Sequence, residues 1–301
     1  MEEIYFSVVI PSYNRAEHLP VVIRSFLEQE HRLFEVIVVD DGSKDNSKEV
    51  VTSFKDERIH YYYKENGERG AARNYGAARA KGTYVTFFDS DDIVYPWYLS
   101  NAAKQLSAIN KPECYAQAFE FRNIMPQSFP PRPDSNPESI IINRKLTKEN
   151  FLACNGVFVR RDILKTYGFS EQRELSGSED WVLWLQLAAN YSFHFSPVVC
   201  SCLVNHSGRG EMNVHPEKMK VRLKLLIEMM RNDEEIGKFG RLEKQQLLSS
   251  GYLFAATKLA DFGIYKFSAI YRLLKSMQYR LSVIGRHNFY VTIRKIFFSW
   301  H

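Results

Sequence analysis

Two hydrophobic patterns alternate along the first hundred residues. Short runs of β-branched and other apolar residues recur, and longer stretches with apolar positions at helical spacing separate them. This alternation is typical of βαβ units around a parallel sheet, an architecture that often binds nucleotides. The pattern predicts strands over residues 6–10, 35–39, 59–63 and 84–88, and helices near residues 18–29, 47–54 and 70–80.

The later part of the chain changes pattern three times. Five of the eleven prolines fall within residues 126–137, so we expect a mobile loop there, because proline interrupts helices and central strands. Residues 155–161 return to a strand-like pattern. Residues 179–189 place apolar positions at helical spacing behind two acids, which favour a helix start. After His215 the pattern is predominantly helical to the end.

Composition excludes several classes of protein. The 301 residues are 45% hydrophobic and 25% charged, which indicates a folded globular chain rather than a disordered or collagenous one. The four cysteines lack the paired spacing of a zinc site and favour a reducing compartment. The first residues include acids where a secretory signal has basic residues, and no run of 18 apolar residues occurs. We therefore expect a cytoplasmic protein without a spanning helix.

The positive charge of the chain is concentrated at its C-terminus. Lys and Arg number 40 against 35 Asp and Glu, and residues 261–301 hold seven basic residues against one acid. Apolar residues stand at positions 264, 267, 270, 271, 274, 277, 281 and 284, mostly on one stripe of a helix. Such a basic amphipathic tail is expected either to rest on an anionic membrane surface or to pack back on the rest of the protein. The modest excess indicates no nucleic-acid partner.

Polar residues directly follow three of the predicted strands. They are residues 11–15 (PSYNR), 40–43 (DDGS) and 89–92 (DSDD). Ligands of open α/β sheets bind at the carboxyl ends of the strands, so these segments are the first candidates for a site. The adjacent carboxylates of DSDD repel one another unless a cation or hydrogen bonds neutralise them. Mg²⁺ or Mn²⁺ is the simplest partner, and the alternative is a solvated turn that caps the next helix.

Four sequence blocks occur in a characteristic order. They are SVVIPSYNR, VIVVDDGSKDNS, ERGAARNYGAARAKGTYVTFFDSDD and SGSEDWVLWLQLA. Together they resemble glycosyltransferase family 2 over roughly residues 6–187. The resemblance implies an α/β GT-A fold, a nucleotide-diphospho-sugar transferase domain with a mostly parallel central sheet flanked by helices. We expect this catalytic domain over residues 1–215, with a nucleotide-binding half at about 1–110 and an acceptor half at about 111–215. A helical C-terminal region is expected over residues 216–301.

The resemblance also assigns donor-binding residues. Pro11, Tyr13 and Arg15 are placed beside the nucleotide, and Asp41 at the edge of a pyrimidine base. A tyrosine ring offers a stacking face, and a carboxylate can accept a uracil N–H. From the residues alone, the alternatives are a packed aromatic at the rim for Tyr13 and a plain Asp-Gly turn residue for Asp41. Arg73 matches the basic residue that family members aim at the nucleotide, and its alternative is a solvated helix arginine.

The family's DxD motif maps onto Asp89, Asp91 and Asp92. By the family pattern, Asp91 lies near the ribose and metal, and Asp92 is a strong candidate for the direct metal ligand, with the order of coordination left open. His206 falls where many family members have a histidine that meets the diphosphate or metal, and a hydrogen-bonded loop histidine is the alternative. The divalent metal, Mn²⁺ or Mg²⁺, would offset charge on the leaving nucleoside diphosphate as a Lewis acid.

The resemblance assigns Asp180, in the Ser-Glu-Asp-Trp block, as the general base for the acceptor hydroxyl. In a single displacement with inversion, this base must reach the hydroxyl on the face opposite the departing phosphate. The alternative is that Glu179 and Asp180 only cap a helix. Trp181 and Trp184 are expected in the core on the same helix, and stacking of one of them on a sugar is the alternative.

The sequence therefore predicts an inverting glycosyltransferase of class EC 2.4, hexosyl- or N-acetylhexosaminyl-transferring, with a nucleotide-sugar donor, a UDP-sugar above others. The expected acceptor is a saccharide or lipid-linked saccharide in polysaccharide or surface-glycan assembly. It is expected between the helix of Asp180 and the proline-rich loop. Membrane contact through the tail would place the protein on the inner face of the plasma membrane.

The alternative function is that of a non-catalytic sugar-nucleotide-binding or interaction protein on the same scaffold. A dinucleotide-binding dehydrogenase is disfavoured, because no GxGxxG follows the first strand.

Overall fold

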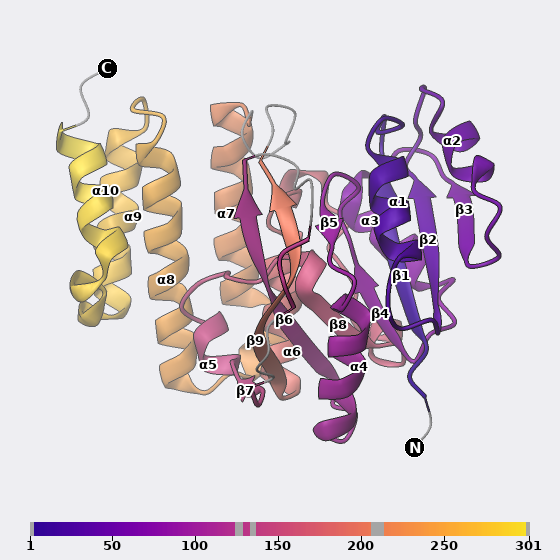
Figure 1. The fold of residues 1–301 in the computed structure, drawn as a ribbon. Helices are drawn as coiled ribbons and strands as arrows, with labels where there is room; N and C mark the ends of the chain where they lie inside the picture. The colour runs from indigo at the N-terminus through magenta and orange to yellow at the C-terminus, as the bar shows by residue number, and fades with distance from the viewer. Residues whose placement is uncertain (1–2, 124–128, 133–136, 206–213, 299–301) are drawn as a thin grey trace. The chain divides into compact units, whose positions relative to one another are not determined.

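The computed structural model describes residues 3–123, 129–132, 137–205 and 214–298 (Figure 1). The chain forms two compact units. The first comprises Met1–Ile142, Leu152–Arg173 and Tyr191–Arg209, and the second comprises Asn143–Phe151, Glu174–Asn190 and Gly210–His301. The boundary expected near residue 215 stays a prediction, and much of the proline-rich loop lies outside the described residues.

One mixed sheet organises the first unit. Its first half is parallel, in the order β3-β2-β1-β4, with β1 (Phe6–Ser12), β2 (Phe34–Asp40), β3 (Ile59–Tyr63) and β4 (Tyr84–Phe87). Every residue of β2 is buried, which explains its unbroken apolar sequence, because the strands of a covered parallel sheet meet apolar surroundings on both faces. The four strands expected from the sequence are confirmed.

Helices connect these strands as expected. They are α1 (Leu19–Leu27), α2 (Ser47–Ser53) and α3 (Glu68–Ala77), and α4 (Tyr98–Ala108) follows β4. Helix α3 packs on β1 and β2 through Gly76, where any larger residue would have to displace a neighbouring side chain. A Cβ atom added at Gly76 would lie 2.4 Å from Val9 Cγ1. The close approach fixes α3, which carries Arg73, against the strands.

The second half of the sheet continues as β8-β6-β9-β5, and β7 also pairs with β9. Strand β8 is antiparallel to β4 and β6, while β6 and β9 run parallel. The bounds are β5 (Ile93–Val94), β6 (Cys114–Arg122), β7 (Ile140–Ile141), β8 (Val157–Arg160) and β9 (Phe193–Val204), with 3₁₀ turns at Cys154–Gly156, Ile163–Lys165 and Arg173–Leu175. Strand β8 confirms the strand expected over residues 155–161.

Aromatic side chains fill the core of this unit. The rings of Phe26 and Phe88 meet edge to face with centroids 5.0 Å apart, and those of Phe6 and Phe158 at 5.5 Å. All four are fully buried, and such edge-to-face pairs add to the free energy gained by burying their area. Phe6 begins β1, whereas Phe88 directly follows β4, so the Phe26–Phe88 pair supports the carboxyl end of β4, where the DxD segment starts.

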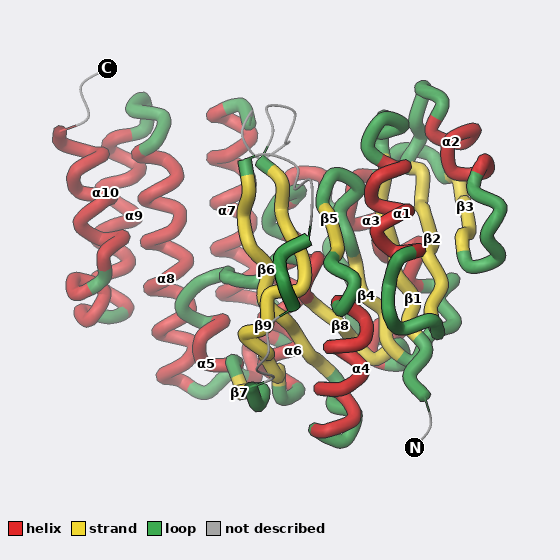
Figure 2. Tube along the Cα trace, in the orientation of Figure 1, coloured by secondary structure: helices red, strands yellow, loops and turns green. Residues whose placement is uncertain are grey.

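Helices build the second unit (Figure 2). They are α5 (Asn143–Leu146), α6 (Glu179–Asn190), α7 (Pro216–Asn232), α8 (Arg241–Ala260), α9 (Lys266–Tyr279) and α10 (His287–Phe298), with 3₁₀ turns at Ile236–Lys238 and Leu281–Gly285. The predominantly helical region expected after His215 is confirmed. No helix in the described part of the chain is both long and apolar enough to cross a membrane.

Both tryptophans of α6 are buried, and Trp181 belongs to a hydrophobic cluster of the second unit. Trp184 is fully buried and Trp181 nearly so. The Trp181 ring lies edge to face against Phe254 of α8, and its indole N–H donates to the Leu146 carbonyl over 3.2 Å. The expected core role is confirmed, and the alternative of a sugar-stacking face is wrong for both rings.

Candidate active site

The sheet register brings three strand ends together. Ser12 pairs with Asp40, and Asp40 pairs with Tyr63. The chain stays in register one residue further, since the Asp41 N–H donates to the Ser12 carbonyl over 2.8 Å and the Lys64 N–H to the Asp40 carbonyl over 2.9 Å. The loops that follow β1, β2 and β3 therefore start side by side.

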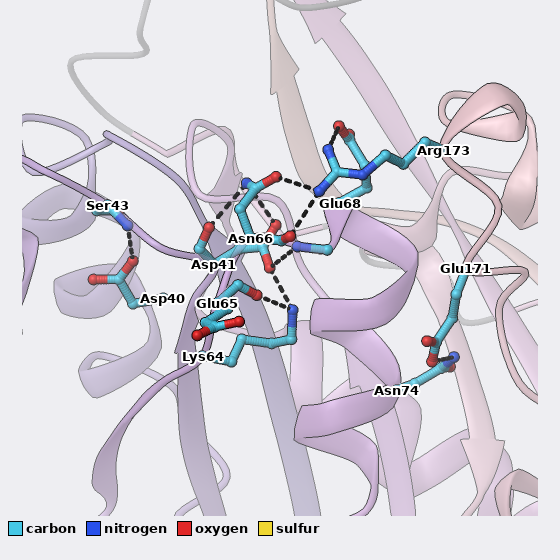
Figure 3. A network of polar contacts seen from close by, with 11 residues as sticks. Asp40, Asp41, Ser43, Lys64, Glu65, Asn66, Glu68, Asn74, Glu171 and Arg173 are labelled. Atoms are coloured by element: carbon cyan, nitrogen blue, oxygen red, sulfur yellow. Dashed lines mark hydrogen bonds and ion pairs between the residues drawn. The ribbon is translucent and has the colours of Figure 1, made fainter.

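Asp41 is buried at the centre of a polar network (Figure 3). Its Oδ1 accepts from Lys64 Nζ at 2.7 Å and from the Gly67 N–H at 2.9 Å, and its Oδ2 accepts from Asn66 Nδ2 at 3.1 Å. A carboxylate offers about four lone-pair directions, so these three bonds leave room for one further donor such as a base N–H. Asp41 thus holds the loop after β3, which a plain turn residue does not do.

A second group of contacts ties this loop to the segment before α6. Arg173 donates to the Asn66 carbonyl at 2.6 Å and to Asn66 Oδ1 at 2.9 Å, and it pairs with Glu68 at 3.1 Å (Figure 3). Asn74 of α3 donates to the Phe169 carbonyl and to Glu171, each over 2.9 Å. These bonds hold α3, and the loop before it, against residues 169–173.

Lys64, Asn66 and Arg173 were not among the site residues predicted from the sequence. The first two directly follow the third predicted strand, so the strand-end rule that identified residues 11–15 and 40–43 would have found them. Arg173 lies more than 100 residues from its partners, and no local pattern identifies it.

The loop after β1 presents Tyr13 and Arg15. Asn14 between them adopts a positive φ of 51°, and its N–H donates to Ser43 Oγ while its Oδ1 accepts from the Lys44 N–H, both over 2.8 Å. Tyr13 is 47% exposed, so the alternative of a packed rim aromatic is wrong. Pro11 is a partly buried residue of β1. The loop holds an accessible ring and a cation at the strand ends.

Arg73 is buried, with 2% exposure. Its Nη2 donates to Asp89 Oδ1 at 2.8 Å, and its guanidinium carbon lies 5.2 Å from the centre of the Phe169 ring. A cation held over an aromatic face gains electrostatic stabilisation from the ring. The alternative of a solvated helix arginine is therefore wrong, and the nucleotide-facing role stays a prediction.

The three aspartates of the DxD segment have different surroundings. Asp92 is buried, and its two oxygens accept from Asn155 Nδ2 at 2.6 Å and from the Val204 N–H at 2.9 Å. Asp89 is partly exposed beside Arg73, and Asp91 lies with its Oδ2 3.8 Å from Arg15 Nη2. Asp92 therefore links the segment to β9 and to the turn before β8, while Asp89 and Asp91 face cations.

These surroundings test the expected divalent ion. Among the residues that the structure describes, no group of three or more His, Cys, Asp or Glu side chains is arranged to hold a metal. Magnesium commonly takes only one or two carboxylates and completes its shell with substrate phosphates and waters. Asp89 and Asp91 fit such a shared site because they are partly exposed. Asp92 is buried and hydrogen-bonded to the protein, and it fits the site less well than the sequence predicted. His206 lies outside the described residues.

Asp180 lies in the first turn of α6, in the second unit. Its Oδ1 accepts from the Trp181 N–H at 2.6 Å, and Asn150 Nδ2 lies 3.4 Å from both of its oxygens. Glu179 is buried and accepts from the Gly177 N–H. The two acids thus differ. Glu179 accepts a hydrogen bond from the backbone just before α6, whereas Asp180 is partly exposed and has the Asn150 amide at the long distance of 3.4 Å.

Known structures share this fold. The crystal structure of S. aureus TarS residues 1–349 in complex with UDP-GlcNAc superposes with a TM-score of 0.70 over 97% of this chain and 88% of that one, at 21% identity. A mannosyltransferase from Pyrobaculum calidifontis in complex with GDP-Man and Mn²⁺ gives a TM-score of 0.58 over 99% of this chain and 88% of that one, at 16% identity. These likenesses confirm the expected α/β GT-A-type fold.

Curated relatives agree in family. An uncharacterized glycosyltransferase of Rickettsia felis is 29% identical over 96% of this chain, which spans 45% of that relative's length. The Escherichia coli UDP-Glc:alpha-D-GlcNAc-diphosphoundecaprenol beta-1,3-glucosyltransferase WfgD is 28% identical over 73% of this chain and 83% of its own.

A family model named Glycosyl transferase family 2 matches residues 7–168, more than half of the 301 residues. The match includes Tyr13, Asp41 and all three aspartates of the DxD segment, and it ends before Asp180. With the fold, the strand-end residues and this match in agreement, the chain belongs to glycosyltransferase family 2.

Proposed function

We propose that the protein transfers a hexosyl or N-acetylhexosaminyl residue from a UDP-sugar to a lipid-linked saccharide, with inversion at the anomeric carbon. The observation that carries this proposal is the preorganised cluster at the carboxyl ends of β1 to β4. There an accessible ring, a buried carboxylate network and two carboxylate–arginine pairs lie within the family match.

The donor's base and ribose are proposed to bind at the ends of β1 and β2. The exposed ring of Tyr13 stacks on the base, and the remaining lone-pair direction of Asp41 accepts a base N–H. The Asn14 and Asn66 contacts hold both loops before the donor arrives, so binding orders few additional residues. The UDP-GlcNAc complex of TarS supports a uridine donor.

Asp89 and Asp91 are proposed to hold a divalent ion together with phosphate oxygens of the donor. When bound, the ion would offset the negative charge that develops on the leaving nucleoside diphosphate. Arg15 and Arg73, which pair with these carboxylates, are cations suited to contact the same phosphates. The Pyrobaculum complex with GDP-Man and Mn²⁺ supports this requirement.

Asp180 is proposed as the general base. It accepts the proton of the acceptor hydroxyl as that oxygen bonds to the anomeric carbon, and the bond from this carbon to the phosphate oxygen breaks. The nucleoside diphosphate leaves with the electron pair of that bond. Asn150, placed between the two carboxylate oxygens, orients Asp180. The name of the E. coli relative, with its diphosphoundecaprenol-linked acceptor, supports a lipid-linked acceptor.

The Asp180→Asn variant tests the base. We expect the rate of transfer to fall by about 10²–10⁴, the usual contribution of a positioned base, with donor binding unchanged. Thermal shifts with UDP, GDP, TDP and CMP, each with and without Mn²⁺, measure binding, and release of nucleoside diphosphate measures transfer. Glu228→Gln, a surface change on α7, is the control. Transfer at the wild-type rate in Asp180→Asn would refute the base assignment, and a metal-independent response to every nucleotide would contradict the proposed donor site.

A further inference from the structure

Helix α9 has apolar residues on two faces. The inner face packs on α8, where Ala269 and Leu273 are buried and the Ser276 carbonyl accepts from Ser249 Oγ at 2.9 Å. On the other side Phe267, Tyr271 and Leu274 are 90%, 55% and 59% exposed. These three residues follow the i, i+4, i+7 spacing of one helix face, and we call them the outer apolar face of α9.

Further apolar residues near the ends of α9 divide between exposed and packed positions. Ile264, before α9, and Leu281, after it, are exposed apolar residues that flank the helix. By contrast, Ile270 and Met277 of the predicted stripe pack against the helical core. The stripe seen in the sequence therefore divides in two. Ile270 and Met277 pack on the rest of the protein, as one of the two predicted alternatives has it. The outer apolar face of α9 is exposed in the described structure.

The charged residues of α9 itself are all basic, and Glu217 of α7 accepts a hydrogen bond from Tyr265, the residue before the helix. Residues 262–301 contain no Asp or Glu. Lys266 and Arg280 are exposed at the two ends of the helix, and Lys275 Nζ lies 5.8 Å from the centre of the Tyr271 ring. Arg286 differs, because it donates to Ser250 Oγ within the unit.

These features select one kind of partner. A second copy docked face to face would bring two sets of basic residues together with no acid on α9 to offset them, which opposes association. An anionic lipid surface satisfies both features, because aromatic and aliphatic side chains enter the boundary between headgroups and acyl chains while lysines and arginines meet the headgroups.

We propose that the outer apolar face of α9 binds the surface of an anionic lipid bilayer. Phe267, Tyr271 and Leu274 insert at the interface, and Lys266, Lys275 and Arg280 contact the phosphate groups. Each basic residue near such a surface strengthens binding by roughly fivefold. This inference goes beyond the proposed transfer reaction and does not rest on it, because lipid binding is measured without donor or acceptor.

Flotation of the full chain with vesicles tests the proposal. We expect binding to vesicles of phosphatidylcholine with 30% phosphatidylglycerol, and binding at least ~10-fold weaker to phosphatidylcholine alone or at high salt. The double variant Phe267→Ser/Leu274→Ser is expected to lose at least ~10-fold in binding, and Lys266→Glu/Lys275→Glu likewise. Leu242→Ser, which removes an exposed leucine of α8, is the matched control and is expected to bind as the wild type does.

Equal binding of both vesicle types, or unchanged flotation of the Phe267→Ser/Leu274→Ser variant, would overturn the proposal. A concentration-dependent dimer in light scattering that this variant abolishes would instead assign the face to a second copy. Thermal melting of each variant confirms that the loss of flotation comes from a folded protein. We expect Asp180→Asn, which loses transfer, to float with the vesicles as the wild type does. The lipid proposal and the proposed function can therefore fail independently of each other.

Discussion

Asp91 and Asp92 are neighbours in the chain, but their side chains have opposite surroundings. Asp92 is buried between Asn155 and the Val204 N–H, and Asp91 points toward Arg15. A buried carboxylate that accepts two hydrogen bonds contributes to stability, whereas a partly exposed one beside a cation is available to a ligand. The same motif thus holds a structural aspartate and a candidate ligand-binding one.

Replacing each aspartate separates these roles. In Asp92→Ala the acceptor of Asn155 Nδ2 and of the Val204 N–H is removed, and each buried donor left unsatisfied costs about 1–3 kcal/mol. We therefore expect the free energy of unfolding to fall by roughly 2–5 kcal/mol. Asp91→Asn is expected to stay within about 0.5 kcal/mol of the wild type, yet to lose the Mn²⁺-dependent response to UDP. Urea unfolding and thermal shifts measure the two effects. Equal stability of both variants would remove the structural role of Asp92.

The sequence could place these aspartates at a strand end but could not tell them apart. Strand ends follow from hydrophobic period, which is local. The partners of Asp92 are 63 and 112 residues away, and they reach it only through the pairing of β8 and β9 with other strands. Lys64 and Asn66 were within reach of the strand-end rule, whereas the burial of Arg73 against Phe169 depends on a segment almost a hundred residues later.

Burial also determines the reactivity of the cysteines. All four are buried and free of disulfides, and burial, reinforced by the charge of Glu120, raises the pKa of Cys202 to about 11. A raised pKa means less thiolate, the reactive form, at any pH below it. We expect iodoacetamide at pH 8 to modify the native thiols at least ~100-fold more slowly than those of the denatured chain. Fast labelling of Cys202 in the native protein, followed by mass spectrometry, would contradict this burial.

At the scale of elements, α3 is the helix that links the sheet to the candidate site. It carries Arg73 and Asn74, and its distance from β1 is set by Gly76. A larger residue there must move either the helix or Val9, and overpacking of this kind typically costs about 1–3 kcal/mol. The position of α3 thereby couples packing in the core to the geometry around Asp89.

Gly76→Ala is therefore expected to lower the free energy of unfolding by roughly 1–2 kcal/mol, although alanine favours helix formation by about 1 kcal/mol. The affinity for UDP should fall with it, because Arg73 shifts. Gly285→Ala is the control, since a Cβ atom there meets nothing within 4 Å. Urea unfolding and UDP titration of both variants provide the measurement. Gly76→Ala with wild-type stability and affinity would show that α3 adapts freely.

Elements with several turns or a clear strand period were predictable, and short ones were not. Strands β1 to β4 follow directly from short apolar runs, and helices α1 to α3 from the helical stretches between them. Strands β5 and β7 have two residues each, too few for any period. The order β4-β8-β6-β9 depends on long-range pairing, and β6 meets β9 with shifts of register near Gln117 and Ala118, which no local pattern encodes.

At the scale of the whole molecule, the two units hold different parts of the proposed chemistry. Tyr13, Asp41 and the DxD segment belong to the first unit, and Asp180 and α9 to the second. Each unit has its own hydrophobic clusters, one around Phe6 and Phe158 and others around α6 to α10. Donor binding is therefore proposed to act first on the unit that holds the strand-end loops.

Hydrogen exchange with and without UDP and Mn²⁺ tests this assignment across the chain. A ligand at about 100 times its Kd stabilises the bound unit by about 2.7 kcal/mol, so amides that exchange by opening of that site should slow by up to ~100-fold. We expect this slowing in residues 11–16, 40–45 and 64–68, where the Asp41 network lies. Amides in the core of α8 should exchange at unchanged rates. Protection concentrated in α8 to α10 would place the nucleotide in the second unit and contradict the proposed donor site, because the residues assigned to the donor would then have no part in binding it.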